Sequence, residues 1–267
     1  MDYEIVIPAA KKDYNKLKYV IESAQNFLVP QPKRINIIHA GHIGGAAGTS
    51  VKLIHEEEVL NLDPNIAKGF SRPPWIYQQF LKLFQDITEE RMYLVIDSDL
   101  ILNRKLELFN KESVPYFFLG VDQNHPPYFK YSDEMFGFGR VYNHSFISEI
   151  MMFDKVIIEA LLMRFYFHQT GKYGNIIQVH QHEQVRNQLI KVIYEKTCDK
   201  ACDGWIPADY EIYGNFVEVF NSSLYEKQKI KTNLRGKYSE WTDTDLESYI
   251  SEMKDKDYDT FTAHTWL

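Results

Sequence analysis

Asp97 and Asp99 are the first residues whose types and spacing suggest chemistry. They lie in the run Tyr93-Leu-Val-Ile-Asp-Ser-Asp-Leu-Ile-Leu102, where four apolar residues precede the acidic pair and three follow it. Such a run is typical of a buried parallel strand, and open α/β sheets bind ligands at the carboxyl ends of their strands. Residues two apart in an extended segment share a face, so both carboxylates can engage one hard divalent cation. The pair therefore predicts a metal and phosphate site.

The elements that must position this pair alternate along the first part of the chain. We expect strands over about 4–8, 34–38, 93–96 and 115–121, with helices over about 11–27 and 75–84. The later part is more mixed, with a strand over about 146–153 and helices over about 155–167, 181–194 and 243–253. This pattern predicts an α/β fold with a mostly parallel central sheet flanked by helices, in a single domain spanning residues 1–267.

Composition and charge exclude several classes of protein. The 267 residues carry a net charge of −7 with a pI of about 5.7, which argues against nucleic acid as a partner. No apolar run reaches the roughly 18 residues of a transmembrane helix. The acidic start, Met1-Asp-Tyr-Glu4, is unlike a secretory signal, so we expect a cytoplasmic protein, free or at the surface of a membrane that carries its acceptor.

Four motifs in a fixed order carry a resemblance to a known family. They are Ile5-Val-Ile-Pro8, Arg72-Pro-Pro-Trp-Ile-Tyr-Gln-Gln-Phe-Leu-Lys82, Val95-Ile-Asp-Ser-Asp99, and Asp209-Tyr-Glu-Ile-Tyr-Gly-Asn215 with a late His264-Thr-Trp266. Over residues 3–266 the chain resembles GT-A-fold glycosyltransferases, and in particular a loosely characterised group from bacterial polysaccharide clusters and large DNA viruses. The resemblance implies a GT-A-like, Rossmann-related fold, with a nucleotide- and donor-binding half over about 1–122 and an acceptor-binding half over about 123–267. It also implies transfer of a sugar from a nucleotide-diphosphate sugar, with UDP or GDP as the nucleotide, to a glycan or other hydroxyl acceptor.

The resemblance also implies a metal site. In such enzymes the strand-end Asp-x-Asp holds Mn²⁺ or Mg²⁺ and, through the ion, the donor diphosphate. Asp99 would be the direct ligand, Asp97 would face the ribose or a water on the ion, and His264 would complete the coordination. A ligand at position 264 requires the last residues of the chain, about 261–267, to fold back onto the donor site.

The remaining donor contacts follow from the same resemblance. The end of the first strand would border the nucleotide base, since small residues there leave room for a flat ring. Side chains before the metal strand would contact donor phosphate or sugar, and the serine between the two aspartates belongs to the same set. The residues expected to bind the donor are Pro8, Ala9, Ala10, Arg72, Gln79, Asp97 and Ser98.

A carboxylate base is the last part that this chemistry requires. An inverting transferase must deprotonate the acceptor hydroxyl, and Asp209 and Glu211 are the candidates because they open a predicted helix. Acidic residues also favour the first turn of a helix for electrostatic reasons alone. The sequence does not choose between the two carboxylates, or between inversion and retention.

Two other functions fit parts of the pattern. A haloacid-dehalogenase-type phosphatase also has an apolar strand ending in Asp-x-Asp, but its strand lies near the N-terminus and its motif continues with Thr or Val, where this chain has Ile101. A non-catalytic carbohydrate-binding protein that retains the fold is the second alternative. The intact Asp97, Asp99 and His264 favour an enzyme over such a protein.

Overall fold

A five-stranded sheet forms the centre of the protein. The computed structural model describes residues 1–41, 43, 50–60, 62–70, 72–83, 85–171, 183–200, 206–237 and 240–265. The strand order is β4-β3-β1-β5-β9, and neighbouring strands are parallel except β5 and β9. The strands are β1 (Tyr3–Ala9), β3 (Ile35–His39), β4 (Val51–His55), β5 (Met92–Ile96) and β9 (Ile150–Asp154). The expected α/β fold with a mostly parallel sheet is confirmed.

Apolar sequence explains why the middle of this sheet is the core. Every residue of β1, β5 and β9 is buried, as expected of strands that are covered on both faces. β1 pairs with β3 on one side and β5 on the other, so the order of strands along the chain reverses between β1 and β5. Ligands of open α/β sheets bind outside the carboxyl ends of the strands at such a reversal. The carboxyl ends of β1 and β5 are therefore where a site is expected.

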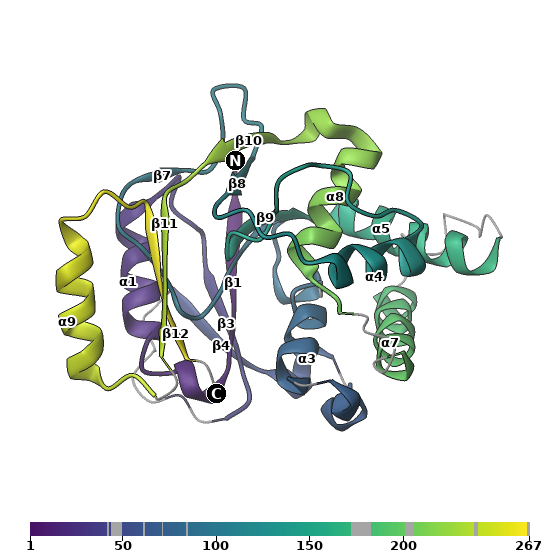
Figure 1. Cartoon of the computed structure of the whole chain (residues 1–267), viewed down its shortest axis with the longest axis horizontal. Coiled ribbons are helices and arrows are strands. Elements are labelled where there is room, and N and C mark those ends of the chain that lie inside the picture. Colours follow the sequence, from purple (N-terminus) through teal and green to yellow (C-terminus); the bar gives the residue numbers. More distant parts are fainter. Residues whose placement is uncertain are drawn as a thin grey trace.

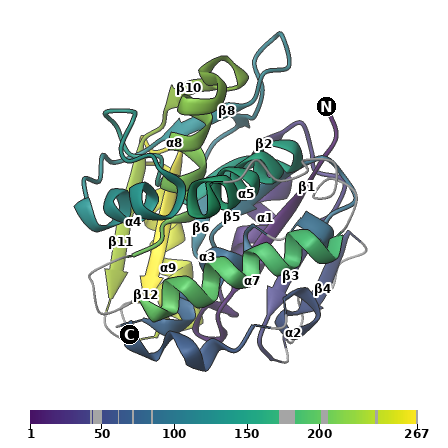
Figure 2. The ribbon, with the colours of Figure 1, turned by 90° about the vertical axis from the view of Figure 1, so that its right-hand side faces the viewer.

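Helices cover both faces of the sheet. Figure 1 shows α1 (Leu17–Phe27) and α9 (Asp243–Lys254) to one side, and Figure 2 shows the opposite group in front of the strands. That second group is α3 (Pro73–Leu81), α4 (Pro126–Phe136), α5 (Lys155–Thr170), α7 (Glu183–Asp199) and α8 (Asp209–Asn221). Shorter helical segments are α2 (Glu56–Val59) and the 3-10 turns Lys11–Asp13, Pro64–Gly69, Gln85–Ile87 and Ser222–Leu224. No helix in the described ranges has the length and apolar character needed to cross a membrane.

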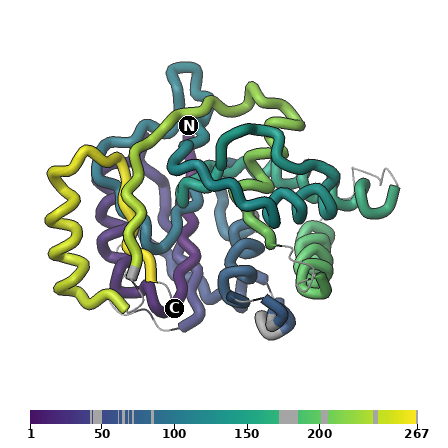
Figure 3. The backbone as a smooth tube through the Cα atoms, viewed as in Figure 1, coloured from purple at the N-terminus to yellow at the C-terminus, as the bar shows by residue number. Residues whose placement is uncertain are grey.

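A second sheet brings the end of the chain to the end of β5. β6 (Leu100–Leu102) follows the Asp97-Ser98-Asp99 turn directly and pairs antiparallel with β12 (Thr260–Thr265), which pairs in turn with β11 (Thr232–Lys237). The Ala263 N–H donates to the Asp99 carbonyl at 3.0 Å. Figure 3 shows the yellow C-terminal segment beside the purple N-terminal one. Two small pairs complete the strands, β8 (Tyr116–Leu119) with β10 (Glu226–Lys229) and β2 (Leu28–Val29) with β7 (Leu106–Glu107).

Several expected boundaries were wrong. The strand expected over 146–153 begins only at Ile150, because Glu149 has a φ of 62° and takes the backbone out of the extended conformation. The helix expected over 11–27 begins at Leu17, after a 3-10 turn. The strand expected over 115–121 forms as β8 but pairs with β10, outside the central sheet, because its partner arrives from a distant part of the chain.

Candidate functional site

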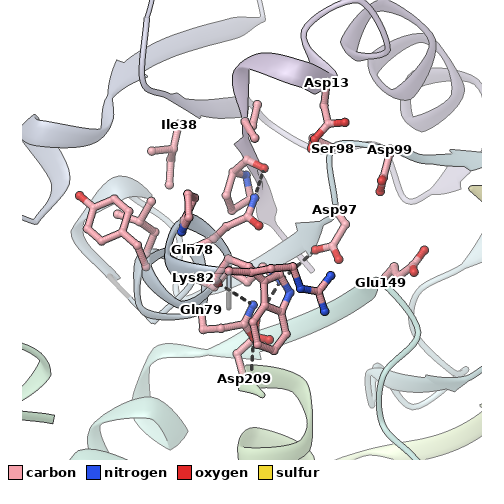
Figure 4. Close-up of a pocket in the computed structure, with 18 of the residues that line it drawn as sticks. Asp13, Ile38, Gln78, Gln79, Lys82, Asp97, Ser98, Asp99, Glu149 and Asp209 are labelled. Carbon is pink, nitrogen blue, oxygen red and sulfur yellow. Dashed lines mark hydrogen bonds and ion pairs between the residues drawn. The ribbon is translucent and has the colours of Figure 1, made fainter. Parts of the chain in front are cut away.

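A cavity of about 950 Å³ opens at the carboxyl ends of β1 and β5. Its walls come from both halves of the chain, and Figure 4 shows the labelled side chains around it. Ten of the eleven residues singled out from the sequence line it, and only Glu211 does not. The ten are Pro8, Ala9, Ala10, Arg72, Gln79, Asp97, Ser98, Asp99, Asp209 and His264.

Asp97, Ser98 and Asp99 form a turn at the end of β5. The Leu100 N–H donates to the Asp97 carbonyl at 3.1 Å, so the segment bends where the sequence pattern indicated an extended strand. Ser98 is buried, and its hydroxyl donates to Asp13 at 3.3 Å. Both aspartates line the cavity, and Figure 4 shows them on one side of it, but each carboxylate is held by a different partner.

Lys82 is a buried cation between two carboxylates. Its Nζ lies 2.8 Å from Asp97 Oδ1 and 3.1 Å from Asp209 Oδ2, and 4.2 Å from the centre of the Tyr210 ring. Burial lowers the pKa of Lys82, but the two carboxylates outweigh it and the net shift is upward. Tyr210 Oη also donates to Asp97 Oδ1, at 2.9 Å. Asp97 is therefore fixed by two donors on one oxygen.

Asp209 begins α8, and Gln79 of α3 holds it in place. The residue before Asp209 is Ala208, which offers no side chain to cap the helix. Gln79 Oε1 instead accepts from the Asp209 N–H at 3.1 Å, while its Nε2 donates to the Trp75 carbonyl at 3.3 Å. Burial raises the pKa of Asp209 to about 6, although Lys82 opposes the shift. Both polar atoms of Gln79 are thus engaged in positioning Asp209.

Glu211 lies away from the cavity. Two residues along a helix correspond to a rotation of about 200°, so Asp209 and Glu211 cannot face the same way. Glu211 is fully buried, and it accepts from the Ser145 hydroxyl at 2.5 Å and from Asn215 Nδ2 at 3.0 Å. Burial raises the pKa of Glu211, against the effect of these hydrogen bonds. Of the two candidate bases, the structure brings only Asp209 to the cavity.

His264 lies between two acidic side chains. Its Nδ1 is 3.0 Å from Asp99 Oδ2, and its Nε2 is 3.0 Å from Glu149 Oε1. Burial lowers the pKa of His264, but the two carboxylates outweigh it and raise the pKa to about 11. Burial raises the pKa of Glu149 to about 7, although His264 opposes it. Burial tends to raise the pKa of Asp99, but the hydrogen bond from His264 helps to lower it, and the net shift is downward.

Buried contacts hold the end of the chain at the site. Lys12 Nζ donates to the Thr265 carbonyl at 2.7 Å, and Lys16 Nζ donates to the Thr265 hydroxyl at 2.9 Å. Trp241 Nε1 donates to the His264 carbonyl at 2.8 Å. The chain thus returns to the cavity as far as Thr265, which is the geometry that a ligand at position 264 requires, and Trp266 lies outside the described residues.

The rest of the cavity has a small-residue wall and an aromatic mouth. Ala9 is buried and Ala10 half-buried, and the Pro8 carbonyl accepts from Gln78 Nε2 at 2.7 Å. At the mouth, the exposed Arg72 guanidinium lies 5.4 Å from the centre of the Trp75 ring. The Trp75 and Tyr128 rings are 6.4 Å apart and tilted by 33°. The mouth thus combines a cation with two aromatic faces.

The chemistry of this cavity fits a hard divalent cation. Asp97, Asp99 and Glu149 offer carboxylate oxygens, which suit Mg²⁺ or Mn²⁺, and His264 adds an imidazole, which Mn²⁺ accepts less readily. One buried oxygen, Glu149 Oε2, has no hydrogen-bond partner among the residues that the structure describes. Within the described ranges, no three His, Cys, Asp or Glu side chains are arranged so that they could bind a metal ion together. Lys82 and His264 pair with the carboxylates instead, so an ion would have to compete with those pairs.

Sequence reasoning missed Lys82 and Glu149. Lys82 ends the Arg72–Lys82 motif, and an isolated lysine at a helix end gives no sign of burial. Glu149 directly precedes an apolar strand, and the start of that strand lies at the cavity only if the strand runs antiparallel to its neighbour. An antiparallel strand begins at the edge where its parallel neighbours end, which places Glu149 beside Asp97.

Comparisons with known proteins give structural likenesses alone. No family model matches the chain, and no curated protein is similar to it in sequence. An active-site mutant of LgtC aligns at 11% identity and a TM-score of 0.45, over 97% of this chain and 86% of that one. Galactosyltransferase LgtC with donor and acceptor sugar analogues aligns at 11% identity and a TM-score of 0.40, over the same shares. Mouse xyloside xylosyltransferase 1, in its apo form, aligns at 10% identity and a TM-score of 0.42, over 98% of this chain and 97% of that one. At such identities and scores, what the site does rests on its own residues and distances.

Proposed function

We propose that this chain is a metal-dependent glycosyltransferase that transfers a sugar from a UDP- or GDP-sugar to a glycan or other hydroxyl acceptor. The observation that carries the proposal is the Asp97-Ser98-Asp99 turn, which ends a buried strand inside a 950 Å³ cavity and has His264 at 3.0 Å from Asp99. The cavity lies at the strand-order reversal, where α/β folds bind nucleotides. Its volume is in the range of sites for small molecules and cofactors.

The donor is held by residues from several elements. Asp99 and His264, with Asp97, hold Mn²⁺ or Mg²⁺, which when bound offsets the negative charge of the departing diphosphate. Pro8, Ala9 and Ala10 border the nucleotide base. The cationic Lys82 orients Asp97, and Ser98 fixes the turn through Asp13. Arg72 meets the donor phosphate or the sugar at the mouth.

A carboxylate then removes the acceptor proton. The bond from the anomeric carbon to the diphosphate oxygen breaks, a bond to the acceptor oxygen forms, and the hydroxyl proton passes to the base. Asp209 is the better placed of the two candidates because it lines the cavity, whereas Glu211 does not. A pKa of about 6 suits a base that works near neutral pH.

The setting of the reaction remains a prediction from the sequence. A cytoplasmic enzyme, free or at a membrane that carries the acceptor, fits polysaccharide biosynthesis of the kind encoded in bacterial polysaccharide clusters and large DNA viruses. The aromatic mouth formed by Trp75 and Tyr128 suits a sugar acceptor, since rings pack against the apolar faces of sugars.

A binding and hydrolysis experiment tests the proposal. Thermal unfolding is followed with UDP or GDP, each with Mn²⁺ and with a chelator. We expect stabilisation by one nucleotide in the presence of metal and none with the chelator, because a ligand stabilises only the state that it binds. A panel of nucleotide sugars scored for hydrolysis with Mn²⁺ then identifies the donor. Release of phosphate from an aryl phosphate, with no effect of nucleotide on unfolding, would contradict the proposal and favour a phosphatase.

A further inference from the structure

Glu149 has three features that ordinary packing does not explain. Its backbone has a φ of 62°, a conformation that side-chain-bearing residues seldom adopt and that is concentrated at functional sites. Its side chain is 9% exposed and lines the cavity. One of its oxygens, Oε2, is buried and has no hydrogen-bond partner in the described part of the chain. A buried oxygen of this kind calls for a partner that a bound ligand can supply.

The neighbourhood of Glu149 indicates which ligand that is. Figure 4 shows Asp97, Asp99 and Glu149 on the same side of the cavity. Glu149 Oε1 lies 3.0 Å from His264 Nε2. The Glu149 carboxylate and the His264 imidazole are therefore neighbours in the cavity wall, close enough for both to reach one ion. Asp99 lies 3.0 Å from His264 Nδ1, so Asp99 and Glu149 flank the same imidazole.

We infer that Glu149 is a further ligand of the divalent cation that Asp99 and His264 bind, with Oε2, which has no hydrogen-bond partner among the described residues, as its ligand atom. This inference rests on the proposed function for the presence of the ion, and it adds a carboxylate outside the Asp-x-Asp turn to the coordination. Glu149 reaches the ion because β9 is antiparallel, so the residue before β9 lies beside the end of β5. The Glu149 carbonyl accepts from the Asp97 N–H at 2.9 Å, which holds Glu149 at this edge of the cavity.

A different role would produce the same proximity. If Glu149 only oriented His264 through the Nε2 hydrogen bond, it would be a positioning residue without contact to the ion. Glu149→Gln separates the two roles, because a glutamine oxygen still accepts from Nε2–H but lacks the charge of a ligand carboxylate. A double-mutant cycle with His264→Ala gives a second separation, since a residue that acts only through His264 has no effect once His264 is absent.

The experiment measures Mn²⁺ affinity by calorimetry, without nucleotide and without turnover. We expect Glu149→Gln to weaken Mn²⁺ binding at least tenfold, in both the wild-type and the His264→Ala backgrounds. Glu4→Gln is the matched control for losing a buried carboxylate, because Glu4 is 2% exposed and binds Asn36 and the Glu89 N–H away from the cavity. A change of less than twofold, or an effect that disappears with His264→Ala, overturns the inference.

A glycine variant guards against a folding artefact. Glu149→Gly removes the carboxylate and relieves the positive φ, so we expect an unchanged or raised Tm together with the loss of Mn²⁺ affinity. Ser113→Gly is its matched control, since Ser113 is exposed and has a φ of 65°. If Glu149→Gly binds Mn²⁺ as tightly as Ser113→Gly does, the inference is wrong. If the wild-type protein itself does not bind Mn²⁺, both this inference and the metal dependence of the proposed function are wrong. If the wild type binds Mn²⁺ and the Glu149 variants bind it equally well, only this inference is wrong.

Discussion

His264 Nδ1 lies 3.0 Å from Asp99 Oδ2, although 165 residues separate the two along the chain. The pairing of β12 with β6 brings them together, and the Ala263 N–H donates to the Asp99 carbonyl. The last strand is therefore part of the wall around the Asp97-Ser98-Asp99 turn. A site built from the middle and the end of the chain depends on the whole fold being complete.

Asp99→Asn should abolish metal-dependent nucleotide binding and leave the fold intact. Asparagine keeps the shape of the side chain, and His264 keeps Glu149 as a carboxylate partner, so the free energy of unfolding should fall only modestly. Calorimetry with UDP or GDP and Mn²⁺ measures the binding. Asp255→Asn is the control, because Asp255 belongs to another Asp-x-Asp pair and is exposed. A variant that unfolds far below the wild type yet still binds nucleotide with metal would make Asp99 structural.

Asp209→Asn should lower kcat by about a hundredfold, the usual scale for losing a general base, with little change in donor affinity. The base acts when deprotonated, and the pKa of Asp209 is raised to about 6. Wild-type kcat should therefore rise as pH increases through about 6 and then level off. The kcat of the variant should not show this rise. Steady-state kinetics across pH check both points. An unchanged rise in the variant would place the base elsewhere.

Glu211→Gln should change stability more than turnover. The Glu211 carboxylate accepts hydrogen bonds from Ser145 and Asn215 in a buried network. A glutamine amide has only one oxygen, so its nitrogen would face a group that donates to Glu211 in the wild type. Leaving a buried polar group unsatisfied costs about 1–3 kcal/mol. Chemical denaturation measures the loss, and kcat per folded molecule should remain within about threefold, because Glu211 lies off the cavity. A hundredfold loss of kcat at unchanged stability would make Glu211 the base instead.

Lys82→Met should destabilise the protein by roughly 3–5 kcal/mol, because it leaves the Asp97 and Asp209 carboxylates without their shared buried cation. The same change should weaken nucleotide binding, since Asp97 loses one of its two donors. Urea denaturation and calorimetry measure the two effects. Lys33→Met is the control, because Lys33 pairs with Asp2 and Glu90 at the surface and should change neither quantity. Equal behaviour of the two variants would contradict the assigned role of Lys82.

Gly214→Ala should destabilise the protein although alanine favours helices. A Cβ built at Gly214 would lie 2.2 Å from Cγ of the buried Phe146 ring, so α8 or that ring must move. Overpacking of this kind costs about 1–3 kcal/mol, which exceeds the helix-propensity gain of about 1 kcal/mol. Gly139→Ala is the control, because its nearest neighbour is the Phe129 carbonyl at 3.8 Å. A Tm equal to that of the wild type would show that α8 can shift freely.

The sequence alone determined the features that depend only on residues close together in the chain, such as a buried strand or the start of a helix. The apolar run of β5 predicted a buried strand with Asp97 and Asp99 at its end, and both line the cavity. The two prolines after Arg72 marked the start of α3, and Asp209 marked the start of α8. These features are readable because periodicity and helix-end chemistry act over a few residues.

Tertiary structure decided the partners and orientations of the same side chains. Which of Asp209 and Glu211 faces the cavity depends on the face of α8 that packs against the core, and both residues have equal standing in sequence. The burial of Lys82 between Asp97 and Asp209 needs α3, β5 and α8 to meet. Glu149 reaches the site only because β9 is antiparallel, since strand direction is set by long-range pairing and has no mark in the residues themselves.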